Sequence, residues 1–64
     1  MSSINYWIQK EFKNISERTI CKVVTKENEV VFEGTIKELR STNVNQMQAI
    51  ECTVELPKLV FTLE

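Results

Sequence analysis

Residues 29–39, EVVFEGTIKEL, constrain the fold of this chain more than any other stretch. Three β-branched or aromatic side chains, Val30, Val31 and Phe32, suit a pleated, half-buried strand. Gly34 is the chain's one glycine. Because glycine adopts positive φ freely, we expect Gly34 to let the chain leave the sheet. The stretch therefore predicts a strand, a break and the start of another element.

A short helix is predicted directly after the break. Thr35 and Glu38 have the spacing of a capping box, in which each side chain accepts a hydrogen bond from the backbone N–H of the other residue. Ile36 and Leu39 stand three apart, which makes one side of a single helical turn apolar. A glycine before a threonine also occurs in phosphate-binding loops, but the second glycine and the lysine of such a loop are absent, so we interpret the pair as structural.

Apolar residues near the N-terminus recur at helical spacing. They are Ile4, Trp7, Ile8, Phe12 and Ile15. Ser2 or Ser3 is predicted to cap the start of this helix. We expect the helix to lie across one face of a sheet, with Trp7 as its large anchor and Tyr6 at the rim. The alternative is an amphipathic helix that lies on a membrane surface or binds a partner.

The first strand is predicted over residues 19–25 and a turn over residues 26–29, with Asn28 as the residue most tolerant of a left-handed conformation. An even loop length sets Lys22 opposite Glu33, a favourable cross-strand pair of opposite charges. The same register also makes two further pairs. They are Thr25 with Val30, and Val23 with Phe32.

The two faces of this predicted hairpin differ in polarity. The inward face is predicted to carry Cys21, Val23, Val30 and Phe32. The outward face holds Ile20, Val24 and Val31, which is more apolar than a solvated face requires. We therefore predict a second surface that a partner covers. Together with Tyr6 and Trp7 of the N-terminal helix, these three give the candidate partner contacts of the chain: Tyr6, Trp7, Ile20, Val24 and Val31.

A second hairpin is predicted at the C-terminal end. Residues 49–56 and 59–63 alternate apolar with polar side chains, as half-buried strands do. The expected pairs are Leu56 with Leu59, Val54 with Phe61, and Cys52 with Leu63, all with Ile50 on the buried face. Pro57 conflicts with a tight turn, because two-residue hairpin loops favour positive φ. Either the loop is wider, or the two strands are not neighbours.

The polar stretch 40–48, RSTNVNQMQ, reads as a loop with Val44 and Met47 turned inward. Together the patterns predict one domain, residues 1–64, of the α+β class. Its sheet has four strands and is mainly antiparallel, with the N-terminal helix packed on one face and a short helix after the second strand, in the order α-β-β-α-β-β. A chain of 64 residues is near the lower limit for a self-sufficient core, which favours a dimer or a partner protein.

Charge and composition argue against several classes of function. The formal net charge is −1 and basic residues form no run, which disfavours duplex nucleic acid. The chain has no histidine, no aspartate and two cysteines, too few ligands for a zinc site and no common general base. We predict no cofactor and no enzymatic activity, with Cys21 and Cys52 as buried free thiols. A spanning apolar segment and a signal peptide are both absent, so we expect a cytoplasmic protein.

Two segments carry a recognisable pattern. Residues 21–39, CKVVTKENEVVFEGTIKEL, give a hairpin and the run F-E-G-T leading into a short helix, and residues 59–64, LVFTLE, give an apolar last strand. In these segments the chain resembles small uncharacterised proteins of phages and mobile elements in low-GC Gram-positive bacteria. The resemblance covers under half of the chain and implies a fold without naming an active site.

These observations favour a small non-enzymatic protein-interaction module. It would be a homodimer or bind another protein, as an accessory, regulatory or inhibitor protein of a phage or mobile element. The alternative is a nucleic-acid-binding accessory protein, in which Tyr6 and Trp7 stack on bases. The cations available for that role are Lys10, Lys13, Lys22, Lys26, Lys37 and Arg40.

Overall fold

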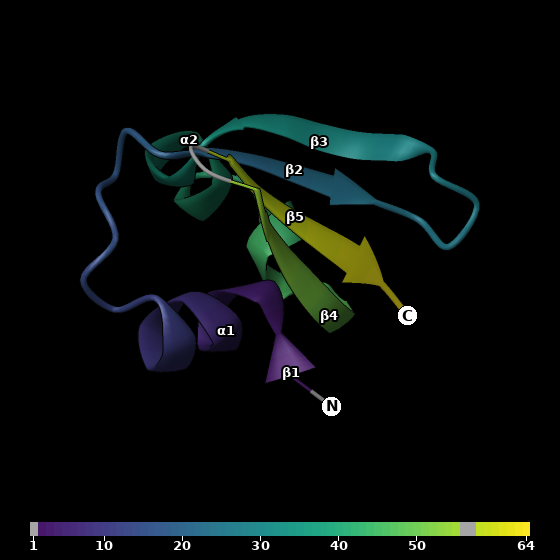
Figure 1. The fold of residues 1–64 in the computed structure, drawn as a ribbon, viewed down its shortest axis with the longest axis horizontal. Helices are drawn as coiled ribbons and strands as arrows, with labels where there is room; N and C mark the ends of the chain where they lie inside the picture. The colour runs from purple at the N-terminus through teal and green to yellow at the C-terminus, as the bar shows by residue number, and fades with distance from the viewer. Residues whose placement is uncertain (1, 56–57) are drawn as a thin grey trace.

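The computed structural model describes residues 2–55 and 58–64. Its elements, in chain order, are β1 (Ser2–Ser3), α1 (Ile4–Glu11), β2 (Ile20–Val24), β3 (Val30–Thr35), α2 (Ile36–Arg40), the 3₁₀ helix η1 (Asn43–Gln46), β4 (Gln48–Glu55) and β5 (Lys58–Leu63). The strands form one sheet in the order β1-β4-β5-β2-β3 (Figure 1). β2 and β5 run parallel at its centre, and the other neighbours are antiparallel.

The predicted α+β class is confirmed, but the predicted number of strands is wrong. The sheet has five strands because Ser2 and Ser3 pair with Ala49 and Gln48 as β1. Two serines carry no alternating apolar pattern, so the sequence gives no signal for this strand. The sheet is also mixed, since β5 lies between its hairpin partner β4 and the parallel strand β2.

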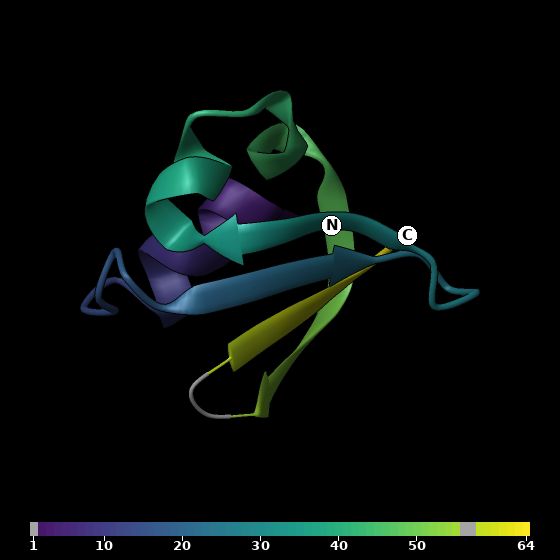
Figure 2. The ribbon, with the colours of Figure 1, turned by 90° about the horizontal axis from the view of Figure 1, so that it is seen from above.

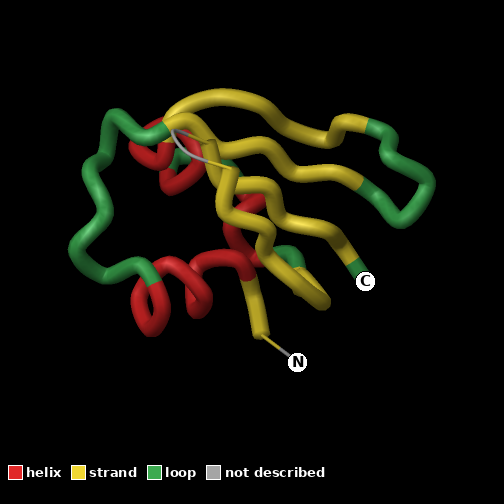
Figure 3. Tube along the Cα trace, in the orientation of Figure 1, coloured by secondary structure: helices red, strands yellow, loops and turns green. Residues whose placement is uncertain are grey.

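The helices lie on the inner side of the curled sheet (Figures 2 and 3). Between the two layers is one core, made of Ile4, Ile8, Cys21, Val23, Ile36, Leu39, Ala49, Leu59, Phe61 and Leu63. The ring of Phe61 meets that of Phe12 edge-on, with centroids 6.4 Å apart and planes at 85°. This geometry matches the attraction between the positive edge of one ring and the negative face of another.

Helix α1 is shorter than predicted but buries the predicted side chains. Its N-cap is Ser3, whose Oγ accepts from the N–H of Tyr6 at 3.1 Å. The helix ends at Glu11, yet Phe12 and Ile15 still pack against the core from the following turn. The apolar spacing therefore indicated the packing correctly and overestimated the length of the helix.

The capping box at the start of α2 is confirmed. Oγ1 of Thr35 accepts from the Glu38 N–H at 3.2 Å, and Oε1 of Glu38 accepts from the Thr35 N–H at 3.3 Å. The prediction of positive φ at Gly34 is wrong, because this residue stays in the ladder opposite Cys21. A Cβ at position 34 would lie 3.1 Å from Cζ of Phe32, so glycine leaves room for that ring.

The first hairpin has the predicted register over most of its length. Lys22 pairs with Glu33, Val23 pairs with Phe32, and Asn28 has φ of 66°. An irregularity after Val23 then sets Val24 opposite Val30, where Thr25 was predicted. As a result Val30, predicted to face inward, is 54% exposed. A bulge of this kind adds local twist and re-aims the side chains beside it.

The second hairpin keeps its predicted faces but not its predicted register. Cys52 pairs with Phe61, and Val54 pairs with Leu59. The slide from the predicted pairs is two residues, which leaves the side chains of residues 51–55 on their predicted faces because the period of a strand is two. Residues 56–57, where Leu56 was predicted beside Leu59 and Pro57 in the turn, lie outside the described residues.

Two inward predictions near the start of β4 are wrong. A register shift between Ala49 and Glu51 turns Ala49 into the core and leaves Ile50 45% exposed. Met47 is 41% exposed, whereas Val44 packs partly buried against the core as predicted. The stretch predicted as a plain loop contains η1, which begins after a threonine cap.

Candidate interaction surface

The face of the sheet that points away from the helices is an open surface among the described residues. The strand register places every second residue of each strand on it, in three rows that run from β4 across β5 and β2 to β3. The rows are Glu55, Lys58, Ile20 and Thr35; Thr53, Val60, Lys22 and Glu33; and Glu51, Thr62, Val24 and Val30. We call these twelve residues the open face.

Charges on the open face are arranged with cations in the middle and anions at both sides. Lys58 lies beside Glu55, and Lys22 lies beside Glu33. Opposite charges on neighbouring strands attract each other. The centre of the face is thus largely neutralised within the sheet, while Glu51 faces Thr62 and has no lysine opposite it.

The five predicted contact residues do not form one surface. Ile20 and Val24 lie on the open face, where Ile20 is 38% exposed and Val24 only 6%. Val31 is exposed at the irregular end of β3. Tyr6 and Trp7 belong to α1, on the opposite side of the sheet. The predicted set therefore divides between two sides of the molecule.

Trp7 serves as an anchor for α1 within the fold. It is partly buried, and its Nε1 donates to the backbone oxygen of Ala49 in β4 at 3.2 Å. Tyr6 is exposed, with Nζ of Lys10 at 5.8 Å from its ring centroid, within the range of a cation–π contact. Of the two aromatic side chains, Tyr6 is the more open to solvent, with 49% of its surface exposed.

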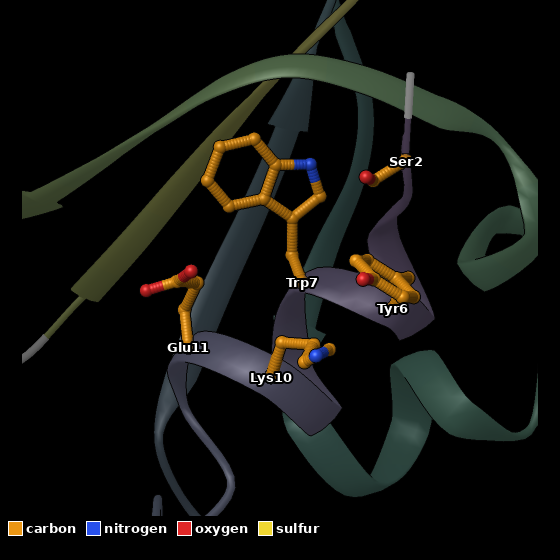
Figure 4. Close-up of a pocket in the computed structure, with 5 residues that line it drawn as sticks. All are labelled: Ser2, Tyr6, Trp7, Lys10 and Glu11. Atoms are coloured by element: carbon orange, nitrogen blue, oxygen red, sulfur yellow. The ribbon is translucent and has the colours of Figure 1, made fainter.

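A hollow lies beside α1, lined by Ser2, Tyr6, Trp7, Lys10 and Glu11 (Figure 4). Its volume is about 80 Å³. Pockets that enclose drug-sized ligands measure roughly 300 Å³ or more. The hollow is therefore too small to enclose such a ligand.

The two cysteines are weak nucleophiles at neutral pH. Burial, and to a smaller extent the charge of Glu38, raises the pKa of the Cys21 thiol to about 11. Burial, followed by the charge of Cys21, raises the pKa of Cys52 to about 11 as well. Neither thiol forms a disulfide. Because their pKa values are raised, both are protonated near pH 7, whereas a reactive cysteine requires a thiolate.

Within residues 2–55 and 58–64, no three side chains of the ligating types gather into a metal site. Over the same residues, no helix has both the length and the apolar character needed to cross a bilayer. The cations proposed for nucleic acid lie on different sides: Lys22 is on the open face, Lys10 on α1 and Lys37 on α2. Arg40 is paired with Glu17 at 3.1 Å.

Both edges of the sheet expose apolar side chains, and the sequence patterns did not reveal this. At one edge, β3 exposes Val30 and Val31. At the other edge, β4 exposes Ile50 and Val54, the latter 52% exposed. Finding these edges requires the strand order, which depends on contacts between distant segments. Val31 was predicted on the outward face and is exposed, whereas Val30, Ile50 and Val54 were predicted on buried faces.

Comparisons with protein-family models, with curated proteins and with solved structures found no match for this chain.

Proposed function

We propose that this chain is a small non-enzymatic protein-interaction module that acts inside the cell as an accessory, regulatory or inhibitor protein of a phage or mobile element. The observation that carries the proposal is the exposed apolar surface at the two sides of the sheet, at Val30 and Val31 on the edge strand β3 and at Ile50 and Val54 on β4, which β1 covers over two residues only. An edge strand presents unpaired backbone groups, and exposed apolar side chains beside them favour pairing with another chain.

The chemistry of the described residues supports the same conclusion. The thiols of Cys21 and Cys52 have raised pKa values and are protonated near neutral pH. The hollow beside α1 is small, with a volume of about 80 Å³. A protein with surfaces of this kind acts by contact and not by turnover of a substrate.

The test combines light scattering of the purified protein with in-cell cross-linking and affinity capture. We expect a defined self-association or a captured partner, and we expect Ile50→Lys or Val30→Lys to abolish it. Met47→Lys is the matched control, since Met47 is a similarly exposed apolar residue that lies outside the strands, at the C-cap of η1. A strict monomer that captures the same proteins in all four forms would overturn the proposal.

A further inference from the structure

We propose that the free edge of β4 is a docking site for an extended segment of another protein that carries basic side chains alternating with apolar ones. The segment would add to the sheet as a further strand, in line with β1. This inference rests on the proposed function and names the surface and the partner chemistry for it. The free edge means the side of β4 from Glu51 to Glu55, which lies beyond its pairing with β1 and has no strand partner among residues 2–55 and 58–64.

The backbone of β4 offers hydrogen-bonding groups along this edge. The N–H of Glu64 donates to the oxygen of Gln48, so the even-numbered residues of β5 direct their backbone groups at β4. Thr53 and Glu55 pair with Val60 and Lys58, so their backbone N–H and C=O groups are directed at β5. The alternation leaves the N–H and C=O of Cys52 and Val54 directed at the free edge.

The opposite edge of the sheet is less suited to an added strand. The oxygen of Thr19 accepts from the N–H of Ile36, so the alternation directs the groups of Glu33 and Thr35 outward. The Thr35 N–H is already bound by the carboxylate of Glu38 at 3.3 Å. Toward the other end of β3 the ladder becomes irregular near Val30. A bulge is one way in which natural sheets block an edge, and the occupied Thr35 donor removes one hydrogen bond that an added strand would need.

The side chains of β4 specify the chemistry of the incoming strand. Glu51, Thr53 and Glu55 lie on the open face, and Glu51 has no lysine beside it. Cys52 and Val54 lie on the inner side, where Val54 is half exposed. A strand aligned with this edge would place two basic residues next to the glutamates and apolar residues next to Val54 and Cys52. Its pattern is basic, apolar, any residue, apolar, basic.

A second copy of this chain fits the same edge poorly. Antiparallel self-pairing centred on Thr53 would set Glu51 opposite Glu55 twice, and like charges directly opposite each other are destabilising. Centring the pair on Cys52 would bring Glu55 of one copy against Ala49 of the other. That position is already occupied by Ser2 of β1. The charges and the position of β1 therefore favour a different, basic partner.

The probe is a blocked peptide with the core Lys-Val-Thr-Val-Lys, and the comparison peptide has Glu-Val-Thr-Val-Glu in its place. Binding to the full chain is measured by amide NMR shifts and by fluorescence anisotropy of the labelled peptides. Any purification tag follows Glu64, because chain added before β1 would run along the edge under test. We expect the basic peptide to bind at least about tenfold more tightly than the acidic one, with shifts centred on Cys52 and Val54.

Charge reversal of the protein gives the decisive comparison. Glu51→Lys with Glu55→Lys should reverse the peptide preference, whereas Glu33→Lys on the β3 edge is the matched control and should leave it unchanged. N-methylation of the peptide amides that point at β4 should abolish binding, and methylation of the alternate amides should not.

The docking proposal is overturned if neither peptide binds at millimolar concentration, if the preference does not reverse, or if the shifts centre on β3. Self-association through β4 in light scattering would overturn it in favour of a homodimer. Loss of partner capture in Ile50→Lys or Val30→Lys, together with any of these results, would leave the interaction function standing and remove only this partner chemistry.

Discussion

Raising the pH above the ordinary pKa of a thiol should destabilise the fold, because the folded state keeps Cys21 protonated. This side chain is buried in the core, and burial, with a smaller effect from the charge of Glu38, raises its pKa from 9.0 to about 11. The unfolded chain therefore loses the thiol proton at a lower pH than the folded chain. The stability that the neutral thiol contributes is fully present below pH 9.0 and is lost as the pH rises through about 11.

The magnitude follows from the two pKa values. Near pH 10 the unfolded thiol is about nine-tenths ionised and the folded thiol about one-tenth, which lowers the free energy of unfolding by about 1.4 kcal/mol. The full difference corresponds to about 2.7 kcal/mol. Cys52 also has a pKa raised to about 11, but its partial exposure to solvent makes its contribution smaller.

The assay is urea unfolding from about pH 8 to about pH 10.5 in the presence of a reductant, with wild type compared against Cys21→Val. Every other ionisable group is common to the two proteins, so the difference between the two slopes isolates the thiol. We expect the wild type to lose stability more steeply above pH 9.0. Parallel pH profiles for the two proteins would refute the reasoning.

Three further changes test the local structure. Thr35→Ala removes the hydroxyl that accepts from Glu38 and should lower the free energy of unfolding by about 1 kcal/mol in urea titrations. Gly34→Ala places a Cβ 3.1 Å from the Phe32 ring and should destabilise by about 1–2 kcal/mol. Lys22→Glu sets two glutamates opposite each other and should cost about 0.5–1 kcal/mol, with recovery on adding Glu33→Lys.

Each change has its own control. Thr35→Ser keeps an accepting hydroxyl and should retain most of the stability, so an equal loss in both variants would argue against the cap. For Gly34→Ala, the penalty should shrink in a Phe32→Ala background, and an unchanged penalty would show that the ring is not the obstacle. For Lys22→Glu, the loss of unfolding free energy relative to wild type should be smaller at high salt than at low salt if charge repulsion is the cause.

The parts of the fold that the sequence predicts are those fixed by near neighbours. The capping box needs only Thr35 and Glu38, which are three residues apart. The left-handed Asn28 and the pairing of Lys22 with Glu33 lie within a single hairpin. In each case the determining residues are close in sequence, so a local pattern is sufficient evidence.

The parts of the fold that the sequence does not predict depend on contacts between distant segments or on single-residue irregularities. β1 exists because Ser2 and Ser3 meet β4 at a separation of more than forty residues. The exposure of Ile50 follows from one extra residue in the ladder, which reverses the alternation before it. The slide of the second hairpin keeps the faces, so hydrophobic alternation could not detect it.

In the candidate interaction surface too, only the features set by residues near in sequence were predicted. Ile20 was placed correctly on the outward side of β2, since one strand's alternation decides it. Val24 shares that side but is nearly covered, and Tyr6 and Trp7 lie on the far side of the sheet. The free edge of β4 becomes visible only when the order of the strands is known.

The last strand described, β5, sits between β4 and β2 and holds the two halves of the sheet together. During synthesis, β2 and β3 leave the ribosome before β5 and have no central neighbour until residues 58–63 follow. Folding is thus delayed until translation of this region is complete, and a ribosome stalled ahead of residue 58 would hold an open hairpin exposed to proteases.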